Sequence, residues 1–321
     1  MKEVLLINQK TTPHYRIPVY NYLGKYLESK DYLLTVVSEG PQNGYAYEME
    51  YRHINIPLTF FTLAHLIVKT KPDAIIYWVN LKHVYLLPLM ILIKFLNKKL
   101  LYWGHGKDLL STNTSRLKSF AYSFEHWISD AIILYGQQLI TNINRKFHHK
   151  IFIANNTLNF DNYFFKHSDK NEVLSKYNIK TKLNIICMGR MQWRKRLDHL
   201  YQAFVSLARE DVGLIFVGPD DEGVLKEING KNIYKIPPLY GNERLDLLCS
   251  ADIFCIPGAL GLSLVDAFYC GLPVVTEAGD MSPEIMYLKD GINGFVVPRD
   301  NINTLTEKLR LLLEDTCLRE N

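Results

Sequence analysis

The sequence predicts an α/β protein made of two doubly wound, Rossmann-like domains. Short apolar runs recur along the whole chain, and helical patterns fill the gaps between them. The runs are continuous rather than alternating, as expected for parallel strands covered by helices on both faces. A polar, strand-poor segment, 159–182, separates two sets of such runs. We therefore expect an N-terminal domain over residues 1–165 and a C-terminal domain over 166–321, facing each other across a cleft.

The predicted strands lie in two groups of six. In the first half they are 3–8, 33–39, 74–79, 100–106, 131–136 and 151–156, and in the second half 183–190, 213–219, 233–238, 253–258, 273–278 and 294–298. The segment LDHLYQAFVSLA (197–208) places apolar residues at the spacing of one helical face. In doubly wound sheets, ligands bind beyond the carboxyl ends of the strands, so the residues after each strand are the candidates for function.

Composition excludes several classes of protein. The longest apolar run, 84–93, is about half of the roughly 20 residues that a membrane-spanning helix needs. The N-terminus has no apolar core of a signal peptide, so we expect a cytoplasmic protein. No GxGxxG or GxxxxGK motif follows a strand, which argues against a nicotinamide dehydrogenase and a P-loop ATPase. The five cysteines lack CxxC spacing, which argues against a zinc site or a disulfide framework.

Charge is unevenly placed along the chain. Residues 1–160 contain 18 Lys and Arg against 10 Asp and Glu, whereas the rest of the chain is acidic. This bias suits an anionic membrane surface or an anionic substrate, and an ordinary solvated surface explains it equally well. The basic residues are dispersed and no aromatic-basic motif is present, so we expect no nucleic-acid partner.

The strand at 183–190 leads into the basic turn GRMQWRKR. Gly189 allows a tight turn, Arg190 stands at the strand tip and Lys195 falls near the start of the next helix. Cations are unfavourable at a helix N-terminus, because the helix dipole prefers anions there. An anion bound between them would resolve this conflict, and a solvated basic turn is the alternative.

The stretch PGALGLSLVDAFYCGLPVV (257–275) has a similar arrangement. Gly258 and Gly261 permit close approach of a ligand to the backbone, and a helix is expected to start near Ser263. Asp266 is the one acid in this apolar stretch. It either contacts the ligand or caps the helix, since Ser263-x-x-Asp266 is close to a capping box.

These two motifs resemble those of the retaining glycosyltransferases of family 4. GRMQWRKRLDHLYQAF is similar to the family's G-R-x-x-x-x-K-x-x-D-x-L-x-x-A-F segment, and GLSLVDAFYCGLPVV with PEI (283–285) and DGINGFVVP (290–298) looks like its second signature. TPHYRIPVYNYL (12–23), YWGHG (102–106) and ANNTL (154–158) are similar to bacterial polysaccharide-building members. The resemblance implies a GT-B fold, with the acceptor bound by the first domain and a nucleotide sugar by the second.

The resemblance also implies roles for individual residues. Arg190 and Lys195 would bind the donor diphosphate and stabilise the leaving nucleotide, and Asp266 would hold the ribose hydroxyls. His105, at a strand end, would face the donor sugar, or it is a structural histidine. The remaining implied contacts are to the donor for Gly189, Gly258, Gly261, Leu262 and Glu284, and to the acceptor for Tyr15 and Arg16. An ordinary surface arginine at a helix start explains Arg16 equally well. The implied chemistry needs no metal or other cofactor, and no DxD motif occurs: Asp220-Asp221-Glu222 is contiguous.

Two features depart from the family pattern. Gly258 stands where the family has an acid near the donor sugar, and the chain stops at LLLEDTCLREN, so we expect the family's final crossover helix to be absent or truncated. The prediction is a retaining hexosyltransferase that uses a nucleotide sugar and acts on a glycan or lipid-linked glycan in surface polysaccharide synthesis. The alternatives are a catalytically degenerate partner subunit that binds nucleotide or glycan, and a GT-B sugar-nucleotide epimerase.

The segment LKHVYLLPLMILIKFLNKK (81–99) bears on membrane attachment. It is apolar in the middle, with lysines at both ends. It either lies at the inner face of the plasma membrane, with its lysines reaching anionic lipid, or forms a buried helix after the strand at 74–79, which we favour.

Overall fold

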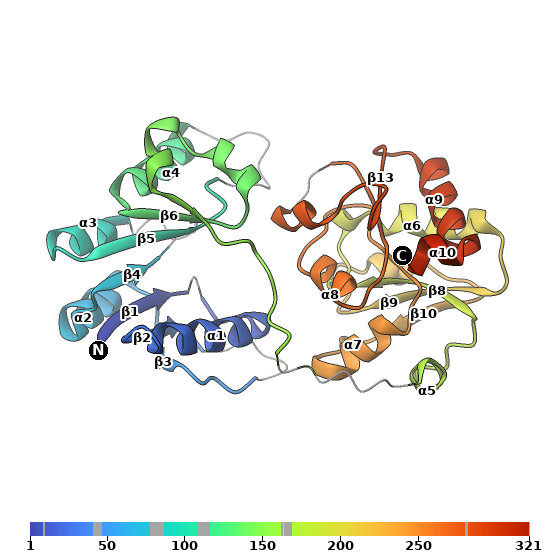
Figure 1. Ribbon diagram of the computed structural model, residues 1–321, viewed down its shortest axis with the longest axis horizontal. Coiled ribbons are helices and arrows are strands. Elements are labelled where there is room, and N and C mark those ends of the chain that lie inside the picture. The colour runs from blue at the N-terminus through green and yellow to red at the C-terminus, as the bar shows by residue number, and fades with distance from the viewer. Residues whose placement is uncertain are drawn as a thin grey trace. The chain divides into compact units, whose positions relative to one another are not determined.

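The computed structural model describes residues 1–8, 10–40, 47–77, 87–107, 116–161, 163, 169–279 and 282–320. The chain divides into two compact units, Met1–Asn162 and Tyr163–Asn321 (Figure 1). Each unit is a parallel sheet with helices packed against it. This confirms the predicted fold class.

The first unit holds a seven-stranded sheet in the order β3-β2-β1-β4-β5-β6-β7. Its strands are β1 (Lys2–Ile7), β2 (Tyr32–Ser38), β3 (Arg52–Asn55), β4 (Ala74–Ile76), β5 (Lys99–Gly104), β6 (Ala131–Leu134) and β7 (Ile151–Ile153). Its α-helices are α1 (Ile17–Glu28), α2 (Phe60–Thr70), α3 (Leu87–Phe95) and α4 (Arg116–Ile128). All neighbouring strands run parallel.

Strand β1 shows why its apolar run is continuous. Leu5 and Ile7 point to one side of the sheet, into a core cluster shared with α2 and α3. Val4 and Leu6 point to the other side, into a cluster that includes Ile17 of α1. Because helices cover both faces, every residue in the middle of the strand is buried, and alternation disappears.

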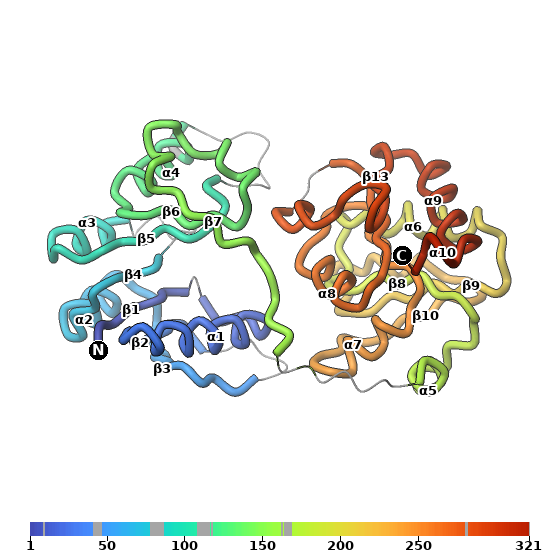
Figure 2. The backbone as a smooth tube through the Cα atoms, in the orientation of Figure 1, coloured from blue at the N-terminus to red at the C-terminus, as the bar shows by residue number. Residues whose placement is uncertain are grey.

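The second unit holds a six-stranded sheet in the order β10-β9-β8-β11-β12-β13. Figure 2 follows the backbone of this unit, coloured from yellow-green to red. Its strands are β8 (Leu183–Met188), β9 (Val212–Val217), β10 (Ile233–Ile236), β11 (Ile253–Cys255), β12 (Val274–Glu277) and β13 (Gly294–Val297). Its α-helices are α5 (Lys170–Lys176), α6 (Leu197–Leu207), α7 (Gly241–Cys249), α8 (Ser263–Tyr269), α9 (Ile302–Glu314) and α10 (Thr316–Glu320). The predicted apolar face of α6 is buried, and α6 packs against α9.

Each of the twelve predicted strands corresponds to an observed strand, and one observed strand was not predicted. Strand β3 has the polar sequence RHIN and pairs only with β2, at the edge of the first sheet. Helix α5 lies inside the segment predicted to be a linker.

The strand order of the second sheet fixes where a ligand would bind. After β8 the chain builds outward through β9 and β10, and from β11 it builds in the opposite direction through β12 and β13. Strands β8 and β11 are neighbours, so the sheet reverses its direction of winding between them. The residues that follow these two strands lie at the topological switch point, the usual ligand site of such sheets.

Helix α3, which lies in segment 81–99, is only partly buried, whereas a buried helix was expected there. Leu89, Met90 and Ile93 are in the core, while Ile91 and Phe95 are exposed. Residues 81–86 lie outside the described residues. Within the part of the chain that the structure describes, no helix has both the length and the apolarity to cross a membrane.

Candidate functional site

The turn after β8 brings a buried lysine to the switch point. Gly189 has φ +118°, and a Cβ atom there would lie 2.9 Å from the Nζ atom of Lys195. Lys195 ends the 3-10 turn η5 (Trp193–Lys195), just before α6, and only 6% of it is exposed. Among the described residues, its amine has no hydrogen-bond or ion-pair partner. Burial lowers the pKa of Lys195, and Arg194 and Arg190 lower it further.

A buried ammonium group without a counter-ion is costly, because the charged form loses its hydration and gains nothing in exchange. Arg190 is exposed beside the same turn. The two cations are therefore placed as predicted, one at the strand tip and one before the helix. Together they form a positive site whose charge is unbalanced among the described residues, as an anion-binding site requires.

Gly258 packs against this turn through the backbone. Its N–H donates to the carbonyl of Lys195 (2.8 Å), and the N–H of Ala259 donates to the carbonyl of Arg194 (3.0 Å). A Cβ atom at 258 would lie 2.2 Å from the Arg194 carbonyl oxygen. Close approach of a ligand was the expected reason for this glycine, but it is the protein's own backbone that approaches. Gly261 differs, because a Cβ atom there would meet nothing within 4 Å.

Asp266 does not cap its helix. Helix α8 begins at Ser263 as predicted, but its N-cap is Leu262, which forms no side-chain cap. Asp266 is 3% exposed, and its Oδ2 atom accepts a hydrogen bond from Nη1 of Arg244 (2.7 Å). The capping-box interpretation is therefore wrong. Burial raises the pKa of Asp266 to about 6, and the Arg244 guanidinium opposes this rise.

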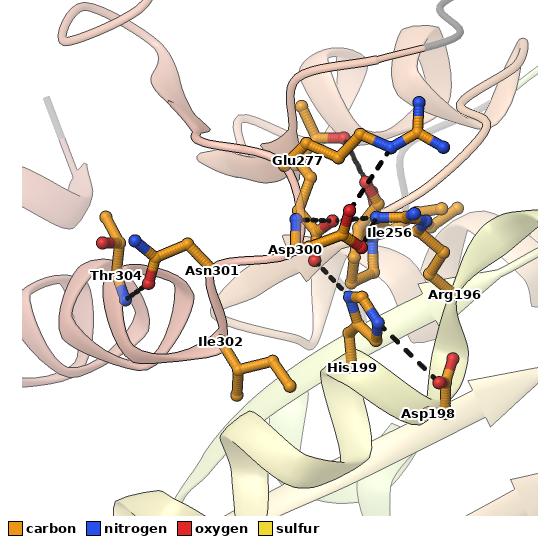
Figure 3. A network of polar contacts seen from close by, with 12 residues as sticks. Arg196, Asp198, His199, Ile256, Glu277, Asp300, Asn301, Ile302 and Thr304 are labelled. Carbon is orange, nitrogen blue, oxygen red and sulfur yellow. Dashed lines mark hydrogen bonds and ion pairs between the residues drawn. The ribbon is translucent and has the colours of Figure 1, made fainter.

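A network of polar contacts around Glu277 adjoins the turn that carries Lys195 (Figure 3). Glu277, buried at the end of β12, accepts hydrogen bonds from Arg196 (2.6 Å) and the backbone N–H of Asp300 (3.1 Å), and contacts Nδ1 of His199 (2.6 Å). Arg196 follows Lys195 and has a left-handed backbone, φ 56°. The ion pair holds this uncommon conformation, so the network fixes the backbone that carries Lys195. These residues were not predicted from the sequence.

Three members of this network have the chemistry of a metal site. Ligand atoms of His199, Glu277 and Asp300 lie within 4.8 Å of one another. However, the Arg196 guanidinium contacts both carboxylates, at 2.6 and 2.7 Å. It already supplies the positive charge that a metal ion would bring, so we interpret the group as an ion-pair network.

Glu284 lies on the 3-10 turn η7 (Pro283–Tyr287) and is 3% exposed. Turn η7 packs against α8, the helix that carries Asp266. The predicted donor residues of the second unit thus come from the segments after β8, β11 and β12.

In the first unit, predicted residues gather at the carboxyl edge of the sheet. Arg16, on the 3-10 turn η1 (His14–Arg16), donates to Oδ1 of Asn156 (2.8 Å). Its guanidinium lies 5.2 Å from the ring centre of Tyr135 and 5.8 Å from that of Tyr15. Asn156 belongs to the ANNTL segment of the resemblance, and Tyr135 was not predicted. Arg16 is partly buried, so it is no ordinary surface arginine.

His105 joins the same edge. It follows β5, and its ring lies 4.9 Å from that of Tyr135. Its backbone carbonyl accepts a hydrogen bond from the side chain of Asn142 (3.0 Å). The histidine therefore belongs to an aromatic and cationic cluster with Arg16, built after β1, β5 and β6.

Comparison with known proteins connects this geometry to a family. Residues 169–321 match the family model described as glycosyl transferases group 1. The matched region lies within the second unit. It contains the Lys195 turn, Gly258, Asp266 and Glu284.

Curated relatives match parts of the chain. It is 31% identical over 140 residues to sulfoquinovosyl transferase SQD2 of Arabidopsis thaliana, covering 42% of this chain and 28% of that protein. It is 22% identical over 231 residues to the N,N'-diacetylbacillosaminyl-diphospho-undecaprenol alpha-1,3-N-acetylgalactosaminyltransferase of Campylobacter jejuni, covering 68% of this chain and 59% of that protein. The chain thus spans less than two thirds of the length of either relative.

A solved structure extends the likeness beyond the matched region. HepE of Anabaena, in complex with UDP-glucose, superposes with a TM-score of 0.78 at 16% identity, over 100% of this chain and 93% of that one. This likeness concerns the fold, and it agrees with the expected GT-B class of two parallel-sheet α/β domains.

Proposed function

We propose that the protein is a retaining glycosyltransferase, which moves a hexose from a nucleoside-diphosphate sugar to a lipid-linked glycan in the synthesis of surface polysaccharide. The observation that carries this proposal is the buried, uncompensated ammonium group of Lys195 at the switch point of the region that matches the group 1 family model. A diphosphate supplies the negative charge that the described residues do not. The names of the two relatives, both sugar transferases, support the reaction class.

Lys195 and Arg190 act on the leaving group in this proposal. As the bond between the anomeric carbon and the diphosphate oxygen breaks, negative charge builds on the phosphate, and the two cations stabilise it. The acceptor oxygen bonds to the anomeric carbon on the same face of the sugar. Its proton passes to the departing phosphate oxygen. The cations thereby take the electrostatic role that a divalent metal has in other transferases, so the proposed reaction needs no metal.

The rest of the nucleotide sugar is placed against α8. Gly261 has open space in front of its Cα atom, which lets a ligand approach the backbone between β11 and α8. Asp266 receives a ribose hydroxyl, and Leu262 and Glu284 complete the donor site. Gly258 contributes through its backbone and not as a missing carboxylate, because its side-chain position is filled.

The first unit binds the acceptor in this proposal. Arg16, held by Asn156 and flanked by Tyr15 and Tyr135, offers a cation among aromatic rings to a sugar or a phosphate group of the acceptor. His105 stands in the same cluster and binds or polarises a sugar hydroxyl.

Helices α3 and α4 support contact with the membrane. They expose four large apolar side chains, Ile91, Phe95, Phe120 and Trp127. Residues 87–107 and 116–153 contain nine Lys and Arg against two Asp and Glu. Exposed apolar groups with surrounding basic charge favour an anionic bilayer surface. The double variant Phe95→Ser, Trp127→Ser should lose co-sedimentation with phosphatidylglycerol vesicles, whereas Val205→Ser on α6 should not; equal binding by both would contradict this surface.

The deciding experiment uses Lys195→Met, which removes the charge and keeps the length of the side chain. We expect nucleotide release from a panel of nucleoside-diphosphate sugars, with polyprenyl-diphosphate-linked glycans as acceptors, to fall by about a hundredfold or more. We also expect the free protein to melt at a higher temperature, because a buried charge without a partner has been removed. A structural lysine would give the opposite change in melting temperature.

The matched control is Lys231→Ala, an exposed lysine of the same unit that pairs with Glu210 at the surface. It should leave both measurements unchanged. Wild-type turnover by Lys195→Met would overturn the proposal. Donor turnover without any acceptor would indicate an epimerase, and donor binding without turnover would indicate a partner subunit.

A further inference from the structure

An ion pair between Arg244 and Asp266 joins helices α7 and α8 of the second unit. Arg244 lies on α7, and its Nη1 atom donates to Oδ2 of Asp266 at 2.7 Å. Its Nη2 atom donates to the hydroxyl group of Tyr163 (3.2 Å), and the guanidinium lies 5.8 Å from the centre of that ring. Only 16% of the Arg244 side chain is exposed. The arginine is therefore fixed on two sides.

The second oxygen of Asp266 is different. Oδ1 is buried and has no hydrogen-bond partner among the residues that the structure describes. An acceptor left unpaired in the interior costs about 1–3 kcal/mol, so such atoms need a reason. Helix α8 follows β11 at the switch point, the usual ligand site of such sheets. A donor hydroxyl on a bound ligand would pair this oxygen.

We propose that Arg244 is a positioning residue for nucleotide binding, which holds Asp266 ionised and turned so that Oδ1 accepts a ribose hydroxyl. This inference rests on the proposed function. Arg244 does not touch the nucleotide in it. The guanidinium occupies Oδ2, which leaves Oδ1 as the free acceptor and fixes the direction of its lone pairs.

The electrostatic surroundings make Arg244 necessary. Burial raises the pKa of Asp266 to about 6, and Arg244 is the group that lowers it. None of the other ionisable groups on these elements carries a positive charge: Glu243, Asp246 and Cys249 on α7, Tyr269 on α8 and Cys270 after it, Glu284 and Tyr287 on η7, and Glu277 on β12. Without the arginine, the pKa of Asp266 would rise further, and a larger share of the carboxyl groups would be protonated at neutral pH. A protonated Asp266 would then offer a hydroxyl donor where the ribose needs an acceptor.

The test compares ribose with deoxyribose ligands. Calorimetric titration of the full chain with UDP, GDP, ADP and CDP identifies the diphosphate that binds most tightly, and its 2′-deoxy and 3′-deoxy forms are measured beside it. The ratio of the two affinities is followed from about pH 5 to pH 8. The diphosphate's own titration affects both ligands alike and cancels in this ratio.

For the wild type, we expect the ribose form to bind about tenfold more tightly or better at neutral pH. This preference should vanish below pH 6, as Asp266 becomes protonated. Arg244→Gln should move that loss to higher pH and reduce the preference at neutral pH by about tenfold, and Arg244→Lys should restore part of it. Arg209→Gln is the control, since Arg209 pairs with Asp211 at the surface of the same unit (2.7 Å).

If Arg244 is purely structural, Arg244→Gln will weaken the binding of the ribose and deoxyribose ligands equally. The pH at which the preference for ribose is lost will then be that of the wild type, and this outcome overturns the inference. Equal binding of ribose and deoxyribose forms by the wild type overturns it too, while a continued requirement for Lys195 leaves the proposed function intact. If none of the four diphosphates binds, the proposed function falls first. Carbon NMR titration of the Asp266 carboxyl, in free wild type and Arg244→Gln, checks the arginine's effect without any ligand, and equal midpoints overturn the inference.

Discussion

Replacing Gly258 by alanine should destabilise the second unit strongly, although the glycine does not need a left-handed backbone. The new methyl group would lie 2.2 Å from the carbonyl oxygen of Arg194 and 2.7 and 2.8 Å from the carbonyl carbon and Cα of Lys195. Ordinary contacts begin at 3.4 Å, so the two segments would have to separate by about 1 Å or more. Two backbone hydrogen bonds, of 2.8 and 3.0 Å, join them at this place and would be strained or lost.

The magnitude follows from these two effects. Forcing a methyl group into a packed site costs about 1–3 kcal/mol, and losing one of the two hydrogen bonds adds about 1 kcal/mol. We therefore expect Gly258→Ala to lower the free energy of unfolding by about 2–4 kcal/mol. For a domain of this size the melting temperature should fall by about 5–15 °C.

Gly261→Ala is the matched control, three residues away in the same loop. Its methyl group would meet nothing within 4 Å, so the free energy of unfolding should stay within about 0.5 kcal/mol of the wild type. Differential scanning calorimetry of the full chain measures both variants. Equal melting of Gly258→Ala, Gly261→Ala and wild type would refute the reasoning. Weaker nucleotide binding by the stable Gly261→Ala variant would show that a ligand approaches this backbone.

Two further predictions concern buried ionisable groups. His126 is 3% exposed, and burial, helped by Lys150, lowers its pKa to about 4. The fold favours the neutral ring, so its stability is complete above pH 6.5 and falls by about 3 kcal/mol as the pH drops from 6.5 towards 4; urea titrations of His126→Phe should lack this part of the pH dependence, and an unchanged dependence would contradict it. Glu277→Ala should lower the free energy of unfolding by about 3–5 kcal/mol, because it leaves the Arg196 guanidinium without its buried partner. Asp300→Asn changes an exposed partner and should lower it by less than about 1 kcal/mol. Equal losses of stability in thermal melts would contradict the role of the network.

The sheet could be predicted from the sequence almost entirely, because strands buried on both faces need continuous apolar runs. The exception is instructive. Strand β3 has one isoleucine among polar residues and lies at the edge, where one neighbour and partial burial suffice. Nothing in its local composition separates it from a loop. Its pairing with β2 depends on the rest of the sheet being present.

The site could be predicted where its parts are close in sequence. Gly189 and Lys195 belong to one short turn, and their chemistry is visible in it. Arg244 and Asp266 are 22 residues apart, and Arg16 and Asn156 are 140 apart. Such pairs arise only when the sheet order brings different loops to one edge, which composition and spacing do not reveal.

Glu277 shows a second limit of sequence reasoning. It follows the apolar residues of β12, and the sequence gives no sign that its carboxylate organises a neighbouring loop. Its backbone N–H donates to the carbonyl of Pro257 (2.9 Å), and its side chain holds Arg196. One residue thus ties the loop after β11 to the turn that carries Lys195. The role depends on position in the sheet and not on a motif.

The energetics of Lys195 and Asp266 favour a ligand-dependent site. Each is almost fully buried, and each keeps a charged or accepting atom without a partner among the described residues. A domain has only about 5–15 kcal/mol of net stability, so these costs are large enough to matter. Glu277 pairs with Arg196, which follows Lys195 in the chain, and both of its carboxylate oxygens have hydrogen-bond partners. The fold can therefore supply hydrogen-bond partners to a buried carboxylate in this region. The unpaired atoms of Lys195 and Asp266 are the places where a bound diphosphate and ribose would stabilise the protein.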